Sequence, residues 1–224
     1  NQLTGFDHRQ QQLRYLLQQS VNQQYQANIS GGGSAQNYFV SAGHDRNMLN
    51  SVGNFNERTT INANNTYHLF SNKLELNLGI VYTNSRNVGV PSYSLNYPYG
   101  QLADENGNAL VVPAILRPSY IATAGNGKLL NWEQRPLEEL LNRYNQSITS
   151  LTDYRLNLSL KYKILDGLDV STYYTYGKGL SEMNKLNELE SFYTRNLINQ
   201  YTQINNTTGS VTYPLPTGGI LSTN

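Results

Sequence analysis

The stretch Tyr154–Ile164 reads YRLNLSLKYKI and places an apolar or aromatic residue at every second position over eleven residues. Successive side chains of a β-strand point to opposite faces, so this pattern predicts a strand with one apolar face and one polar, partly charged face. Eleven residues is also close to the 9–11 or so that a tilted strand needs to cross the hydrocarbon core of a bilayer. The apolar face of this strand is therefore expected to meet either a protein core or lipid.

The composition restricts the class of protein. The chain has 224 residues, enough for one large or two small domains. Only 14% of the residues are charged and the net charge is +1, which argues against nucleic-acid binding, because that binding depends on Lys and Arg contacts to phosphates. The 18 tyrosines suit strands and also interfaces at which one end of the ring is dry and the other wet. The absence of cysteine excludes disulfides, thiolate metal sites and cysteine nucleophiles.

The sequence has no run of 18 apolar residues, so it predicts no membrane-spanning helix, whereas transmembrane strands would not produce such a run. No signal-peptide pattern stands at its start. We therefore expect either a leader that has been removed or an internal piece of a longer protein.

The alternation of the opening stretch recurs along the chain. Four strands are predicted within residues 20–84 and two within 151–179. Residues 1–19 are predicted to form a loop with a short helix at 6–19, which Asp7 would cap. These segments predict an all-β, antiparallel fold with about six or seven strands.

The predicted connections alternate between short and long. Short turns are expected at 31–34, 71–73 and 166–167, and long loops at 46–56, 85–150 and 180–224. All short turns then lie at one end of the sheet, as in an up-and-down transmembrane β-barrel whose long loops are extracellular. Bacterial barrels begin at eight strands, so we expect the chain to form a segment of a larger barrel.

The two longest loops contain elements of their own. Asn106-Gly107 predicts a small hairpin within 85–150, and Pro136, followed by two glutamates, predicts a helix start. Phe192–Tyr201 is predicted to be a strand within the loop 180–224.

The barrel interpretation assigns a side to each strand residue. Ile29, Leu78, Leu158 and Tyr174 are expected to face lipid, and Asn28, Asn77, Arg155 and Lys161 to face the lumen. The alternative is a soluble all-β module, for carbohydrate binding or cell-surface interaction, which would bury the same apolar faces between two sheets.

The sequence shows no catalytic or metal-binding constellation, so no enzymatic activity, cofactor or metal site is predicted. His8, His44 and His68 are spread over different predicted segments, and convergent groups are needed for chemistry. The run from Asp104 to Asn108 lacks the glycine and the twelfth-position acid of a calcium loop, which favours a hairpin turn. Gly31–Gly33 is expected to be a turn, since no helix or lysine follows it as in a phosphate-binding loop. Trp132 and the loop tyrosines are expected either to stack on sugar rings or to pack within the loop.

Three stretches resemble the SusC/RagA family of TonB-dependent outer-membrane transporters. The first is YQANISGGGSAQNYFVSAGHD at Tyr25–Asp45, which is similar to an early barrel hairpin of that family. The second is a series of loop motifs that includes LADENGNAL at 102–110, GNGKLLNW at 125–132 and PLEEL at 136–140. The third is YTRNLIN at 193–199, with GGIL at 218–221. The loop motifs are the most specific, because so many residues recur in order.

The resemblance implies a bacterial outer-membrane barrel, powered by TonB through an N-terminal plug, that imports glycans or peptides together with a SusD-like surface lipoprotein. No part of this sequence matches the plug, the TonB box or the closing strand of the family. The resemblance therefore implies that these residues supply part of the wall and some extracellular loops. It assigns no individual substrate-binding residues.

Overall fold

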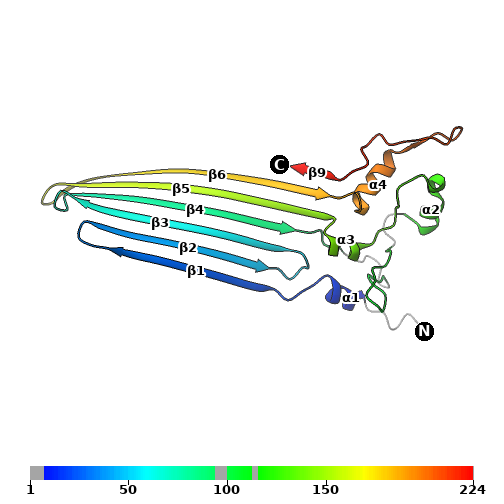
Figure 1. The fold of residues 1–224 in the computed structure, drawn as a ribbon, viewed down its shortest axis with the longest axis horizontal. Coiled ribbons are helices and arrows are strands. Elements are labelled where there is room, and N and C mark those ends of the chain that lie inside the picture. Colours follow the sequence, from blue (N-terminus) through cyan, green and yellow to red (C-terminus); the bar gives the residue numbers. More distant parts are fainter. Residues whose placement is uncertain (1–7, 94–99, 113–115, 224) are drawn as a thin grey trace.

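The computed structural model describes residues 8–93, 100–112 and 116–223, and its main element is a long antiparallel sheet (Figure 1). The seven strands are hydrogen-bonded in the order β1-β2-β3-β4-β5-β6-β9, and every neighbouring pair is antiparallel. The prediction of an all-β, antiparallel chain is confirmed, and within the described residues the sheet is open. The strands are β1 (Val21–Gly32), β2 (Gln36–Met48), β3 (Phe55–Leu69), β4 (Leu74–Gly89), β5 (Asn145–Leu165), β6 (Leu168–Asn187) and β9 (Ile220–Thr223).

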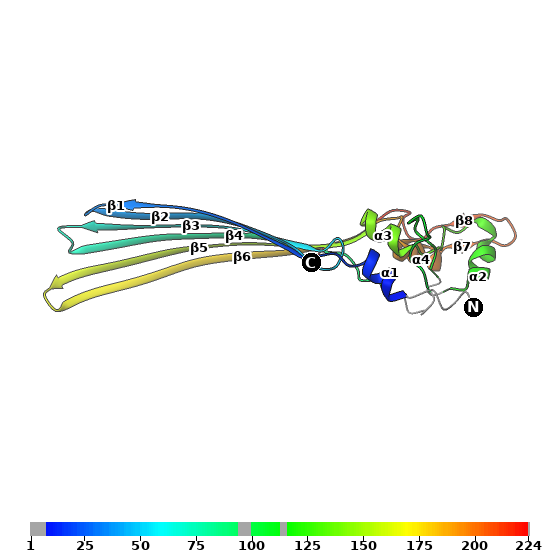
Figure 2. The ribbon, with the colours of Figure 1, turned by 90° about the horizontal axis from the view of Figure 1, so that it is seen from below.

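The sheet forms a single curved layer, with no second layer on either face along β1 to β6 (Figure 2). Strands β1 to β6 follow one another along the chain and are joined by hairpins, apart from the long connection between β4 and β5. The short turns all lie at one end of the sheet, and the long connections and helices lie at the other (Figure 1).

Two of the short turns adopt backbone conformations with positive φ. In the Asp166–Gly167 turn between β5 and β6, Gly167 has a φ of 92°, which glycine adopts without a steric penalty. In the turn between β3 and β4, the non-glycine residues Phe70, Ser71 and Asn72 have φ values of 52°, 54° and 65°. The first turn is at Gly33–Ala35, where the Gly33 N–H donates to the carbonyl oxygen of Gln36 at 2.8 Å, so Gly31 and Gly32 belong to β1.

Strands β4, β5 and β6 are longer than predicted at the end remote from the turns. They reach Gly89, Asn145 and Asn187, whereas the predicted strands end near 84, 151 and 179. Polar residues interrupt the apolar pattern in these extensions, but the backbone ladder continues because it does not depend on side-chain polarity. The register of β4 and β5 runs without a break from Asn84 and Thr152, at the predicted ends, to the pair Gly89 and Ser147.

The region remote from the turns, which we call the loop cap, comprises the described parts of 8–20, 90–144 and 188–219. Its small buried core contains Leu102, Ala103 and Leu137. None of the described helices is both long and apolar enough to cross a membrane. The elements of the loop cap are α1 (His8–Tyr15), α2 (Pro118–Thr123), the 3₁₀ helix η2 (Ala124–Gly127), α3 (Pro136–Asn142), α4 (Phe192–Tyr201), β7 (Gln203–Ile204) and β8 (Val211–Thr212).

Two predictions for this region are corrected. The segment Phe192–Tyr201 is the helix α4, so the predicted strand is wrong. Ser191 caps this helix, since its hydroxyl oxygen accepts from the Thr194 N–H, and the buried side chains lie on one helical face. The first helix ends at Tyr15, before the predicted end at residue 19, and its expected cap Asp7 lies outside the described residues.

Candidate functional site

The two faces of the sheet differ in chemistry, and the strand register defines them. Leu78, Leu158 and Tyr174 are register partners and share one face, while Gly79, Asn157 and Thr175 share the other. All strand residues predicted to face lipid lie on the first face, which we call the apolar face, and all those predicted to face the lumen lie on the second, the polar face.

A band of large apolar side chains crosses the apolar face without cover. Ile29 on β1, Ile80 on β4 and Tyr174 on β6 are 61%, 50% and 61% exposed. Monomeric soluble proteins rarely leave contiguous apolar surface of this extent open to water. Asn65 is a polar residue within the band, and its amide is satisfied by Gln36 at 3.1 Å and by the Tyr67 hydroxyl at 2.9 Å.

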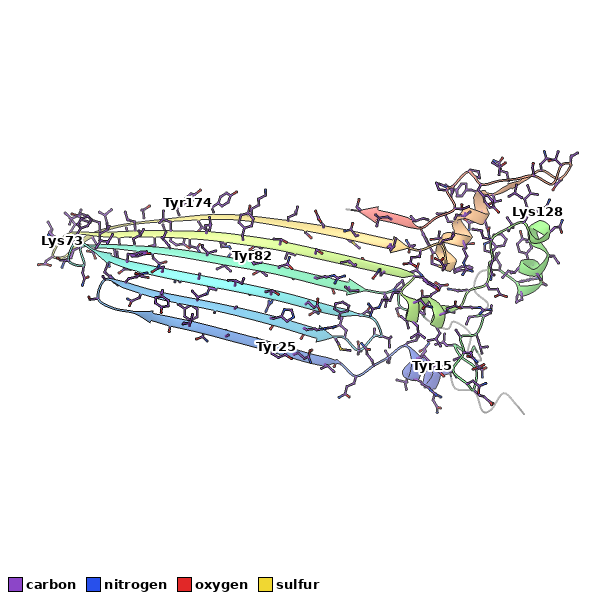
Figure 3. All side chains as sticks on the ribbon, in the orientation of Figure 1. Tyr15, Tyr25, Lys73, Tyr82, Lys128 and Tyr174 are labelled. Carbon is purple, nitrogen blue, oxygen red and sulfur yellow. The ribbon has the colours of Figure 1, made fainter. Side chains whose placement is uncertain are left out.

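Tyrosines lie along both borders of this band. Those on the side of the turns are Tyr38, Tyr67 and Tyr162, and those on the side of the loop cap are Tyr25, Tyr82, Tyr154 and Tyr176. Figure 3 shows Tyr25, Tyr82 and Tyr174 along the sheet, between Lys73 at the turns and Tyr15 and Lys128 in the loop cap.

Both tyrosine borders run obliquely across the strands. The register row of Tyr25 meets β6 at Leu180, but the border tyrosine of β6 is Tyr176, four residues nearer the turns. The row of Tyr38 meets β5 at Leu158, but the border tyrosine of β5 is Tyr162, again four residues nearer the turns. The band is therefore tilted in the same direction at its two edges.

Charged side chains follow the band on the side of the loop cap. One register row of the apolar face contains Arg46, Glu57, Arg86 and Glu182. Arg46 and Glu57 form an ion pair at 3.4 Å. The apolar band thus ends before the strands enter the loop cap.

The polar face is rich in amides and hydroxyls that bond across strands. Asn77 donates to the Thr66 hydroxyl at 2.8 Å, and Tyr173 donates to the Asn157 side-chain oxygen at 3.0 Å. Lys161 pairs with Asp169 at 3.3 Å on the same face. These groups are suited to contact with water or a polar solute.

A buried carboxylate organises the loop cap where it joins the polar face. The Glu139 side chain is 3% exposed and comes from the first turn of α3, which begins at Pro136 as predicted. Its Oε2 accepts from the Tyr93 hydroxyl at 3.1 Å and from Asn145 Nδ2 at 2.9 Å. Its Oε1 accepts from the Phe192 N–H at 3.1 Å. One side chain therefore links α3, β5, α4 and the segment after β4.

Burial dominates the electrostatics of this cluster. It raises the pKa of Glu139, and the opposing effects of the hydrogen bonds from Phe192, Tyr93 and Asn145 and of the Arg195 charge are smaller. Burial, together with the charge of Glu139, also raises the pKa of the Tyr93 hydroxyl.

Two further contacts within the loop cap join the segment before β5 to the segment after β6. The Asn199 side chain donates to the Leu130 carbonyl at 2.8 Å and accepts from the Leu130 N–H at 2.9 Å. Lys128 Nζ donates to the Gly209 carbonyl at 2.6 Å. The connection between β4 and β5 is thus held against the connection between β6 and β9.

A pocket of about 350 Å³ lies beside Glu139, at the end of β5 and β6. We call it the Asn145 pocket. Asn145, Lys185 and Asn187 line it from the polar face of the sheet, and Phe192, Tyr193 and Asn196 line it from α4. Its volume lies within the range of about 300–1,000 Å³ that is usual for small-molecule sites.

The histidines do not converge in the structure. His44 Nδ1 lies 3.0 Å from the Thr59 hydroxyl on the apolar face, and His68 lies on the polar face near the turns, 4.0 Å from Glu75. The side chain of His8 lies outside the described residues. Among residues 8–93, 100–112 and 116–223, no group of three or more His, Asp or Glu side chains is placed to hold a metal ion.

The Asp104–Asn108 segment is the predicted hairpin turn. Asp104 Oδ1 accepts from the backbone N–H groups of Asn106 and Asn108 at 2.9 and 2.8 Å, and Ala103 pairs with Ala109. Hydrogen bonds from Asn108 lower the pKa of Asp104. Asp104 Oδ1 is thus directed at the backbone of its own turn, and Asp104 Oδ2 accepts from Asn108 Nδ2 at 2.8 Å.

Trp132 packs within the loop cap. Its side chain is 8% exposed, and its ring centroid lies 6.0 Å from that of Tyr120. The ring is therefore not open for stacking on a sugar in this structure, whereas Tyr193 and Tyr120 are half-exposed.

The sequence did not reveal the Glu139 cluster or the Asn145 pocket. The helix start at Pro136 was readable, but Glu139 and Phe192 are 53 residues apart and no motif joins them. Asn145 lies in the extension of β5 where the alternation is lost.

Comparison with known proteins provides no assignment. No protein-family model matches the chain, and no curated protein matches it.

Proposed function

We propose that this chain forms part of the wall of a TonB-dependent transporter in the bacterial outer membrane, which imports glycans or peptides with a SusD-like surface lipoprotein. The observation that carries the proposal is the uncovered apolar band between two tyrosine borders. Lipid would cover the whole band and needs no complementary protein surface. The tyrosines would lie at the membrane–water interfaces, where barrels carry aromatic girdles.

The oblique course of the borders supports lipid over a protein core. Strands about 4.8 Å apart and tilted by about 35–45° shift their membrane borders by about one to one and a half residues per strand. The observed shift is four residues over five strand steps at one border and four residues over three steps at the other. The second shift, about 1.3 residues per strand, lies within this range, and the first, about 0.8, corresponds to a slightly smaller tilt of about 30°. Both shifts have the single direction expected of a tilted transmembrane sheet.

The open edges of the sheet support a larger assembly of strands. Among the described residues, β1 pairs only with β2, and residues 168–183 of β6 pair only with β5. Unpaired backbone groups facing hydrocarbon would cost several kcal/mol each, so an open sheet edge would not be stable within a membrane. We propose that further strands complete a closed barrel, with the polar face toward its lumen.

The transport role rests on the resemblance to the SusC/RagA family and on the position of the loop cap. All helices of the described chain lie at the end of the sheet opposite the short turns (Figure 1). In a bacterial barrel the long loops are extracellular. The loop cap would then face the substrate and the lipoprotein lid.

Arginine substitution on the two faces tests the proposal. Arginine in place of Leu158, on the apolar band, is expected to cost about 2–4 kcal/mol near the bilayer midplane, and in place of its neighbour Asn157 very little. The measurement is the folded fraction in outer membranes, read by heat-dependent migration on gels. Equal effects at the two positions would refute the lipid-facing assignment, and a chain that is stable in solution without detergent would favour the soluble alternative.

A further inference from the structure

The charged side chains of the apolar face lie at only one end of the apolar band. On the side of the loop cap, this face carries Arg46, Glu57, Arg86, Lys178 and Glu182. On the side of the turns, no described strand residue of this face is an Arg, Lys, Asp or Glu, and the nearby Lys73 and Asp166 belong to the turns. The two ends of the band therefore meet different chemistry.

Two of these cations, Arg86 and Lys178, have no counter-ion. Both residues are exposed. Within the part of the chain that the structure describes, no ion pair or hydrogen bond engages either side chain. The third cation, Arg46, is already paired with Glu57 at 3.4 Å. Arg86 and Lys178 are therefore available to an anion from outside the chain.

The two unpaired cations lie next to the tyrosine border. Lys178 is the register partner of Tyr154, which is in turn the partner of Tyr82, so an ammonium group follows two phenol rings across β4, β5 and β6. Arg86 lies on β4, four residues from Tyr82 toward the loop cap. Glu182 is four residues farther from the band than Lys178 on the same strand. Lys178 and Arg86 are thus the charges nearest the band on their own strands.

The surface between these two cations is polar but neutral. Asn84 and Thr152 are register partners in the row that separates the row of Arg86 from that of Lys178. They are joined to each other, because Asn84 donates to the Thr152 hydroxyl at 3.0 Å. Cations, neutral polar groups and phenol rings therefore directly adjoin an apolar band. This arrangement matches an amphiphile that has an anionic head and apolar tails.

We propose that Arg86 and Lys178 bind the phosphate groups of anionic lipids in the leaflet on the loop-cap side of the membrane. A guanidinium forms paired hydrogen bonds to phosphate oxygens, and an ammonium group provides a compact positive charge. Both side chains have long apolar stems, which lie along apolar surface while the charged end reaches the head groups. A lipid places its phosphate at the end of its acyl chains, so one molecule satisfies the cations and covers the band.

This inference rests on the proposed membrane function, because it takes the apolar band as the surface that meets lipid. The two claims are nevertheless measured separately. Contact with any lipid tests the membrane assignment. A preference for anionic over neutral lipid at one border, and not at the other, tests the head-group site.

The test is quenching of a single tryptophan in the full chain by brominated lipids. The vesicles contain anionic phosphatidylglycerol and neutral phosphatidylcholine, and only one of the two is brominated in each sample. In a Trp132→Phe background, Tyr82→Trp reports the border on the loop-cap side and Tyr38→Trp reports the border on the turn side. Tyr154→Trp is the second reporter for the loop-cap side, in case the Tyr82→Trp protein fails to fold.

Three variants alter the charge. Arg86→Gln and Lys178→Gln each remove one cation from the apolar face. Arg155→Gln is the matched control, because Arg155 is exposed and adjacent to Tyr154 but lies on the polar face. It removes the same charge at a similar distance along the sheet. A difference between these variants therefore reports the face and not the net charge.

We expect phosphatidylglycerol to be preferred about 3- to 5-fold at Tyr82→Trp, as for one cation beside an anionic lipid surface, and not at Tyr38→Trp. The preference should disappear when Arg86→Gln and Lys178→Gln are combined and should remain in Arg155→Gln. An equal preference at the two borders, an unchanged preference in the combined variant, or an equal loss in the control would overturn the proposal alone. Absence of quenching by either lipid at both borders would overturn the membrane assignment as well.

Discussion

Replacing Glu139 by alanine should destabilise the loop cap much more than any exposed substitution near it. The carboxylate accepts three hydrogen bonds, and those from Asn145 Nδ2 and the Phe192 N–H are buried. Each buried donor left without a partner costs about 1–3 kcal/mol, so Glu139→Ala should lower the free energy of unfolding by about 2–6 kcal/mol. The Tyr93 hydroxyl is only partly buried and can turn to water. Glu139→Gln retains one acceptor oxygen and should cost about 1–3 kcal/mol.

The assay is urea unfolding followed by the fluorescence of Trp132, the single tryptophan, which is buried in the loop cap. Amide exchange at Phe192 reports the lost hydrogen bond directly. Glu138→Ala is the control, because the Glu138 side chain is 41% exposed and, among the described residues, its carboxylate pairs with Arg135 alone, at 3.7 Å, so its loss should cost less than about 1 kcal/mol. Equal stability of the Glu139→Ala and Glu138→Ala proteins would refute the organising role of Glu139.

The remaining predictions concern pH, the bridge within the loop cap and the turns. Because burial raises the pKa of Glu139 above its ordinary value of 4.5, the folded cap binds this proton more tightly than the unfolded chain does. The corresponding stabilisation is complete below pH 4.5 and is lost as the pH rises through the raised pKa. Urea titrations across this range should show the free energy of unfolding falling with pH in the parent but not in Glu139→Gln. Asn199→Ala removes both hydrogen bonds to Leu130 and should cost about 1–3 kcal/mol in the same assay, while substitution of its exposed neighbour, Gln200→Ala, should be neutral. Gly167→Ala should destabilise the folded protein by about 1–2 kcal/mol in thermal unfolding, because φ at Gly167 is 92°. Space is not the cause, since no atom lies within 4 Å of the added Cβ. Gly33→Ala is the control and should be neutral, because Gly33 has the same free space and no positive φ. Ser71→Gly should stabilise the β3–β4 turn by about 0.5–1 kcal/mol in that measurement, since Ser71 has a φ of 54°, and a loss of stability would contradict the strain assigned to it.

The strands were predictable because alternation is a direct consequence of strand geometry. In β5 the apolar residues Leu156, Leu158 and Leu160 fall on one face, and each pairs in register with a residue of the same face on β4. The turns were readable from Asp166-Gly167 and Asn106-Gly107, since glycine permits the positive φ that both turns use. Local rules therefore sufficed for the sheet and its hairpins.

The loop cap was predictable only in part, because tertiary contacts determine it. The α3 start at Pro136 was visible, but α4 was taken for a strand, although Ser191 and Thr194 form a helix-capping pair. The bonds from Asn199 to Leu130 and from Phe192 to Glu139 join residues 69 and 53 positions apart. Neither separation leaves a periodic signal, so the Asn145 pocket could not be predicted from one sequence.

The central claim is that the band beside Leu158 meets lipid and the face of Asn157 does not. Its most direct test is quenching of a single tryptophan by brominated acyl chains, with tryptophan placed at Leu158 or at Asn157 in a Trp132→Phe background. We expect strong quenching at Leu158 and little at Asn157, because the two side chains lie on opposite faces of β5. Equal quenching at the two positions, or no quenching at Leu158, would contradict the account.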